Sequence, residues 1–141
     1  MSWLTRHRIK QSDVKSLKDI PGFDFKDTYV CDNKGTVYKV WQKLNKEYLV
    51  DTMKPFYTRD GYVEYILTNK YGVKKHIQAH RIVAYLYLPL PKDINKKYVN
   101  HKNGIRSDNR AVNLEWTTAS ENIKHSFVIL GKQVWNKGIK K

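Results

Sequence analysis

The sequence contains very little of several features that would point to particular kinds of protein. Cysteine occurs once, at Cys31, so the chain can form no internal disulfide and no zinc site built from several thiolates. The longest apolar run, residues 82–88, is far too short to span a membrane, and the first ten residues hold no apolar core of a secretory signal. We therefore expect no membrane partner, no secretion and a location in the cytoplasm.

Acidic residues are also scarce, because 13 Asp and Glu stand against 27 Lys and Arg, a formal net charge of +14. Three stretches hold no acid at all: residues 1–10, residues 66–92 and the tail from His125 onward. So many positive charges on a chain of this size repel one another unless an anionic partner is normally bound. Nucleic acid is the first candidate for such a partner. A chain of 141 residues allows one compact fold with extensions.

The first half of the chain shows the alternation and turn residues of β-hairpins. Two hairpins are predicted, with strands at 28–32 and 36–41 around Asn33-Lys34-Gly35, and at 62–68 and 73–78 around residues 69–72. Another turn is indicated at residues 59–61. The first twenty residues favour a short helix that stops at Pro21-Gly22.

Residues 79–88, AHRIVAYLYL, predict a buried helix that ends before Pro89. We expect His80, at its start, to be a capping or partly buried histidine rather than a catalytic one. After it, strand-like KYVN (97–100) and VNLEW (112–116) enclose a long loop of amides, glycine and arginines. Thr118 and Glu121 then form a capping box, which predicts a helix from Ala119.

The ends of this last region carry a spaced set of polar residues. His101 is followed twelve residues later by Asn113, and Asn113 nine residues later by Asn122. The motifs VNHKNG, NLEW and SEN with the following His, preceded by AHRIVAYLYLP, resemble the HNH endonuclease family, specifically its phage and intron-borne homing type. The similarity extends upstream through IPGFDFKDTYVCDNKGTVYKV and MKPFYTRDGYVEYILTNKYG, so it covers roughly residues 18–127.

The resemblance implies an α+β fold in which an antiparallel β-hairpin DNA-binding module precedes a ββα-metal (His-Me finger) nuclease motif. The corresponding divisions are a basic segment at 1–20, the β-rich module at 21–78, the nuclease module at 79–127 and a basic tail at 128–141. A phage or mobile-element homing or nicking enzyme acting on double-stranded DNA is expected. Whether it works as a monomer or a dimer stays open.

The resemblance also implies roles for individual residues. His101 is the general base, Asn113 holds its imidazole, and Asn100 and Asn122 are metal ligands. His125 is a possible metal or phosphate ligand, although Ser126 fills the position that a second helix ligand has in zinc-binding relatives. The expected cofactor is Mg²⁺, with Mn²⁺ also possible, and the expected products have 5′-phosphate and 3′-hydroxyl ends.

Hydrolysis of a phosphodiester needs residues of these types, independently of the resemblance. An imidazole with an ordinary pKa of about 6.5 can take a proton from water at neutral pH. Amide oxygens are acceptable ligands for a hard cation. Asn100 stands where many relatives have Asp, so we expect weaker metal affinity or reliance on the DNA phosphate as a ligand. The basic residues expected to contact the DNA backbone are Lys70, Lys74, Lys75, Arg81, Lys102, Arg106, Arg110 and Lys124.

Other interpretations remain. The main alternative is a sequence-specific DNA-binding protein that keeps this fold and does not cleave. An RNA-binding or ribosomal protein would explain the charge and the tyrosines but not the spacing. Asp60 and Glu64 are the nearest approach to a paired-carboxylate nuclease core, but that core requires a Lys where this chain has Ile66.

Overall fold

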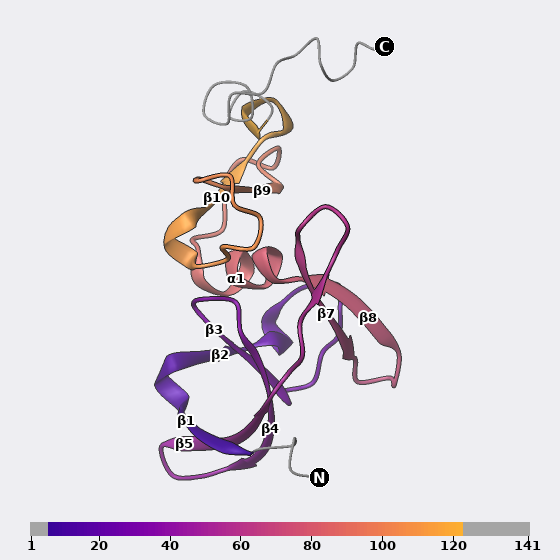
Figure 1. Ribbon diagram of the computed structural model, residues 1–141, viewed down its shortest axis with the longest axis vertical. Coiled ribbons are helices and arrows are strands. Elements are labelled where there is room, and N and C mark those ends of the chain that lie inside the picture. The colour runs from indigo at the N-terminus through magenta and orange to yellow at the C-terminus, as the bar shows by residue number, and fades with distance from the viewer. Residues whose placement is uncertain (1–5, 123–141) are drawn as a thin grey trace.

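The computed structural model describes residues 6–122, which form three antiparallel sheets and one complete helix (Figure 1). The first sheet has five strands in the order β1-β5-β4-β3-β2. Its strands are β1 (His7–Lys10), β2 (Val14–Ser16), β3 (Tyr29–Asp32), β4 (Val37–Lys43) and β5 (Glu47–Thr52). The second sheet consists of β6 (Phe56–Tyr57), β7 (Val63–Thr68) and β8 (Lys74–Gln78).

Both hairpins predicted from the sequence are confirmed. β3 and β4 pair across the turn that contains Gly35, whose φ of +94° is a conformation that suits glycine. β7 and β8 pair across residues 69–72, where the Asn69 side chain accepts hydrogen bonds from the backbone N–H groups of Tyr71 (2.9 Å) and Val73 (3.0 Å). These turns form locally, which is why the sequence pattern alone could place them.

The helix expected within the first twenty residues does not form, and that prediction is wrong. This segment instead supplies β1, which pairs with β5, and β2, which pairs with β3. Two short 3-10 turns, Gln11–Asp13 and Leu17–Asp19, complete it. The apolar residues Val14 and Leu17, three apart, are both buried, but they reach the core from a strand and a following turn rather than from one helix face.

Helix α1 (Ala79–Tyr87) is confirmed as a buried helix and lies at the centre of the molecule (Figure 1). Ile82 and Val83 are fully buried in one core cluster with residues of all three sheets. Two polar contacts tie α1 to the first sheet: the Lys15 ammonium donates to the Leu86 carbonyl (2.9 Å), and the Tyr87 hydroxyl donates to the Cys31 carbonyl (2.7 Å). Helix α1 and the first sheet therefore share a single core.

Cys31, the only cysteine of the sequence, lies in β3 within this core. Its thiol is free, and burial raises the pKa of that thiol well above the ordinary value.

Among residues 6–122, no helix has both the length and the apolar character needed to cross a membrane.

The third sheet is the hairpin of β9 (Tyr98–His101) and β10 (Leu114–Thr117), which lies on the far side of α1 from the first sheet (Figure 1). Its pairing places Leu114 opposite His101 and Glu115 opposite Asn100. A long loop joins the strands and ends in the 3-10 turn Ala111–Asn113, so Asn113 precedes the strand rather than starting it. Residues 119–122 after β10 are helical, as the capping box predicted.

Candidate active site

His101 lies at the end of β9, buried, opposite the core residue Leu114. Its Nε2 lies 2.9 Å from the side-chain oxygen of Asn109, in a buried contact. Because an amide oxygen can only accept, Nε2 carries the proton of the neutral ring and Nδ1 keeps its lone pair. Burial is the main cause that lowers the pKa of His101, so the ring is neutral at neutral pH and can accept a proton at Nδ1.

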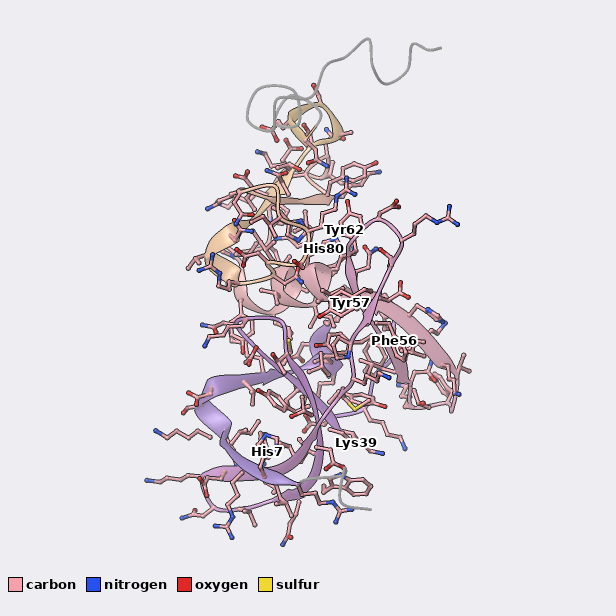
Figure 2. The ribbon with its side chains drawn as sticks, in the orientation of Figure 1. His7, Lys39, Phe56, Tyr57, Tyr62 and His80 are labelled. Atoms are coloured by element: carbon pink, nitrogen blue, oxygen red, sulfur yellow. The ribbon has the colours of Figure 1, made fainter. Side chains whose placement is uncertain are left out.

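Two further rings pack against His101. The His80 ring, from α1, lies 5.0 Å from it in an edge-on arrangement, and the Tyr62 ring lies 5.3 Å from His80 and 6.2 Å from His101. Figure 2 shows Tyr62 and His80 next to each other, between α1 and the turn that precedes β7. The sequence did not assign these two residues to the site, because segments separated by about twenty residues had to meet before their proximity could be seen.

His80 is more deeply buried than the sequence suggested and caps no helix with its side chain. Its Nδ1 has no hydrogen-bond partner within the described part of the chain. Burial is the main cause that lowers the pKa of His80 to about 3, and the positive charge of a protonated His101 or of Arg81 acts in the same direction. His80 therefore stays neutral at ordinary pH and acts as a packing surface for the His101 ring.

The loop between β9 and β10 is tied together by the side chain of Asn113. Its amide donates to Asn103 Oδ1 (3.0 Å) and to the Asp108 carbonyl (2.9 Å), and its oxygen accepts from the Asn103 N–H (3.1 Å). The sequence assigned the contact with the imidazole to Asn113, and the structure gives that contact to Asn109 instead. The reason is that the 3-10 turn directs the Asn113 amide toward the start of the loop.

The two arginines of the loop are already engaged within the protein. Arg106 lies 5.0 Å above the Tyr62 ring and donates to the Asp60 carbonyl (2.8 Å), which links the loop to the turn before β7. Arg110 grips Asp108 with two hydrogen bonds of 2.7 and 2.8 Å, and this contact holds the pKa of the Asp108 carboxyl well below its usual range. Both guanidiniums therefore shape the loop, whatever else they contact.

Asn100 precedes His101 and is also buried. Its amide nitrogen donates to Glu115 Oε2 across the hairpin (2.8 Å), which leaves the amide oxygen as the atom that could bind a cation. Glu115 was not singled out from the sequence, and only the strand pairing reveals its contact.

Asn122 lies in the helical turn that Thr118 begins. The capping box forms as predicted, with Thr118 N–H bonded to Glu121 Oε1 (3.0 Å) and Glu121 N–H bonded to Thr118 Oγ1 (3.1 Å). The Asn122 N–H donates to the Thr118 carbonyl (3.0 Å), which starts the regular helix. The expected site residues Lys124 and His125 lie outside the described residues.

The basic residues expected to contact DNA occupy several surfaces. Lys70 lies over the Tyr71 ring (5.2 Å) at the tip of the β7–β8 hairpin, where Lys74 is exposed and Lys75 half-buried. Arg81 lies 5.6 Å over the Tyr85 ring and hydrogen-bonds its hydroxyl (3.3 Å). Lys102 follows His101 and is exposed.

A second basic and aromatic cluster, on the first sheet, was not predicted. The Trp41 ring is 46% exposed and is flanked by Arg6 (4.2 Å) and Lys39 (4.6 Å), while its indole N–H donates to the Asp51 carboxylate. Figure 2 shows Lys39 on the first sheet, well away from the labelled His80 and Tyr62. The alternation of β4 signals an exposed Trp, but only the fold brings Arg6 beside it.

Together, the fold and this site define an α+β protein with a ββα arrangement: a hairpin that carries a buried histidine at the end of its first strand, followed by a helix. Residues 78–124 match the family model described as HNH endonuclease. This part of the chain is therefore similar to HNH endonucleases.

Individual relatives agree with this similarity. Two proteins of Acanthamoeba polyphaga mimivirus, named uncharacterized HNH endonucleases L247 and L245, are each 36% identical to the chain, over 122 and 84 residues. These matches cover 86% and 60% of this chain but only 28% and 24% of the relatives, so the chain spans about a quarter of their length.

A solved structure is similar over most of the chain. That structure concerns DNA binding and cleavage by the HNH homing endonuclease I-HmuI. The two structures superpose with a TM-score of 0.64 at 28% sequence identity, over 84% of this chain and 62% of the other. The similarity thus includes the β-rich first half as well as the HNH region.

Proposed function

We propose that this protein is a DNA endonuclease that hydrolyses phosphodiester bonds with His101 as general base. The observation that carries the proposal is the buried contact between His101 Nε2 and the Asn109 oxygen at 2.9 Å. It assigns the proton to Nε2 and leaves Nδ1 as the basic atom, which a water molecule aimed at phosphorus requires. The products would carry 5′-phosphate and 3′-hydroxyl ends.

The neighbouring residues would prepare this base rather than take part in the reaction. The rings of His80 and Tyr62 exclude water from one side of the imidazole, which favours its neutral form. Asn113 fixes the ends of the loop that carries Asn109. The general base is therefore held in position before substrate arrives, and little reorganisation is needed for the chemical step.

A divalent metal is expected from the family, and the available donors fit a hard cation. Residues 6–122 contain no group of three or more His, Cys, Asp or Glu that could hold a metal, so the donors are those predicted from sequence, the amide oxygens of Asn100 and Asn122. Oxygen donors of this kind suit Mg²⁺, or Mn²⁺, better than zinc. Such an ion, when bound, neutralises the charge that develops on the leaving 3′ oxygen.

Duplex DNA is the proposed substrate because of the charge of the chain and because the similar solved structure concerns DNA binding and cleavage. We place the DNA backbone along the exposed cations of the β7–β8 hairpin and Lys102, with the Trp41 cluster as a further contact on the first sheet. The division at residue 78 between a DNA-binding part and a nuclease part is part of this proposal. We also propose a role in a phage or another mobile element, and the viral relative supports this.

The test is a cleavage assay with defined variants. Purified protein is incubated with a pool of duplex DNA and Mg²⁺, and the ends of any products are mapped. We expect nicks or breaks that a chelator abolishes, and a loss of about 10²- to 10⁴-fold in His101→Ala with DNA binding retained. The control is His76→Ala, which removes a histidine of β8 that is 61% exposed and paired with Glu64 of β7. Binding without cutting in the wild type would instead establish the non-cleaving alternative.

A further inference from the structure

The turn between β3 and β4 reaches the loop that carries the candidate site. This turn is internally rigid, because Asp32 Oδ1 accepts hydrogen bonds from the N–H groups of Lys34 (2.9 Å) and Thr36 (3.0 Å). The Asn33 carbonyl then accepts from the Ala111 N–H (2.8 Å), two residues after Asn109. A turn of the first sheet is thus bonded directly to the loop between β9 and β10.

Gly35, in the same turn, lies beside Asn109 of this loop. A Cβ atom at this position would lie 3.0 Å from the Cβ of Asn109 and 3.7 Å from that of Ala79, so any residue larger than glycine would crowd Asn109. The Gly35 carbonyl accepts a buried hydrogen bond from the Tyr65 hydroxyl of β7 (2.9 Å). The first sheet, the second sheet and the site loop therefore meet at one glycine.

Asn109 occupies the space between Gly35 and His101. It is only 4% exposed, and its oxygen faces the imidazole while its nitrogen donates to the Ser107 carbonyl (3.4 Å). Since Asn109 is buried and position 35 leaves beside its Cβ only the space that a glycine gives, the amide has little freedom to move away from the ring. An amide that is fixed on both sides is suited to hold a partner ring in one orientation.

We propose that Asn109 is the positioning residue that holds His101 with its proton on Nε2, and that the β3–β4 turn keeps Asn109 in place through Gly35. The inference rests on the proposed role of His101 as general base, and it adds the two elements that hold the His101 ring in place, Asn109 and the β3–β4 turn. It makes the first sheet part of the catalytic framework as well as a DNA-binding element. A residue outside the HNH region thereby affects the chemical step.

The test compares variants at Asn109. Asn109→Ala should lower the single-turnover cleavage rate at saturating protein by about 10- to 100-fold, with unchanged DNA affinity, because only the support of the ring is lost. Asn109→Asp should retain most of the rate, because a carboxylate oxygen accepts the same hydrogen bond. Rescue by Asp distinguishes positioning from a general packing role.

A second comparison uses two glycines with the same kind of backbone. Gly35→Ala should lower the rate in the same way, whereas Gly22→Ala should not, although its φ of +88° is close to the +94° of Gly35. A Cβ at Gly22 meets nothing within 4 Å, so this control carries the conformational strain without the contact. If Gly35→Ala does not fold, Tyr65→Phe replaces it, because it removes the bond that holds the Gly35 carbonyl.

A spectroscopic measurement accompanies the rates. The hydrogen-bonded Nε2 proton of His101 should be visible by ¹H–¹⁵N NMR in the wild type and in Gly22→Ala, and lost to exchange in Asn109→Ala and Gly35→Ala. If the wild type cuts and His101→Ala does not, yet both sets of variants behave like Gly22→Ala, the inference is refuted. If the wild type does not cut at all, the proposed function fails, and the NMR signal still tests the contact by itself.

Discussion

Replacing His80 by leucine should make the protein less sensitive to acid. His80 is buried, packs against the rings of Tyr62 and His101, and leaves its Nδ1 without a partner within residues 6–122. Leucine fills this buried position with an apolar side chain and removes the titrating group. Because an unpaired buried nitrogen costs about 1–3 kcal/mol, the variant should be at least as stable as the wild type at pH 7.

The size of the acid effect follows from the two pKa values. The pKa of His80 is about 3 in the folded protein, against 6.5 for an ordinary histidine. Between these two pH values His80 is protonated in the unfolded chain but neutral in the folded protein. The folded state therefore loses stability as the pH falls from about 6.5 toward about 3. This single group should lower the free energy of unfolding by about 2 kcal/mol between pH 7 and pH 5, and by about 4 kcal/mol at pH 3.

The measurement is urea unfolding of both proteins at pH 7 and pH 5. Groups that do not contact His80 titrate alike in both proteins, so the difference between the two pH-dependent losses reports on His80 and on the His101 ring that it contacts. We expect the wild type to lose about 2 kcal/mol more than His80→Leu. Equal losses would show that the imidazole at position 80 accepts its proton in the folded state, and the description of a neutral, buried His80 would have to be withdrawn.

Three other changes test other parts of the structure. Asn100→Asp adds a carboxylate at a proposed ligand position and should lower the Mg²⁺ concentration at half-maximal cleavage, measured by metal titration; an unchanged or higher requirement would remove Asn100 from the metal site. Lys74→Ala should weaken DNA binding and reduce the slope of log affinity against log salt by about one, and an unchanged slope would show that Lys74 contacts no phosphate. Leu17→Ala should cost about 2–5 kcal/mol in urea unfolding, because Leu17 is fully buried, whereas Lys18→Ala at the exposed neighbouring position should cost little; equal effects would place the 3-10 turn outside the core.

Features that depend on neighbouring residues could be predicted from the sequence. The turn around Gly35 requires a residue that accepts a positive φ, and Asn69 with Gly72 supplies the second hairpin turn. The reciprocal bonds between Thr118 and Glu121 need only a spacing of three residues. In each case the determining contacts lie within a few positions of one another, so a local pattern contained them.

Features that depend on distant pairing could not be predicted. Residues 7–10 are a strand because they pair with β5, about forty positions later, and their own composition does not reveal this. Asn109 contacts His101 only because the loop folds back on itself and Gly35 leaves room for it. The interval from His101 to Asn113 correctly marked the two ends of that loop, but not which amide in it faces the ring.

The burial of Cys31 gives the protein a practical property for solution studies. As the only thiol in the sequence, fully buried and with its pKa raised by that burial, it should react very slowly with maleimides and similar reagents at neutral pH. A cysteine introduced at an exposed position, such as Ser107 in the site loop, would then be the single labelled position without any background mutation. A fluorophore placed there could report in real time on the approach of DNA to His101.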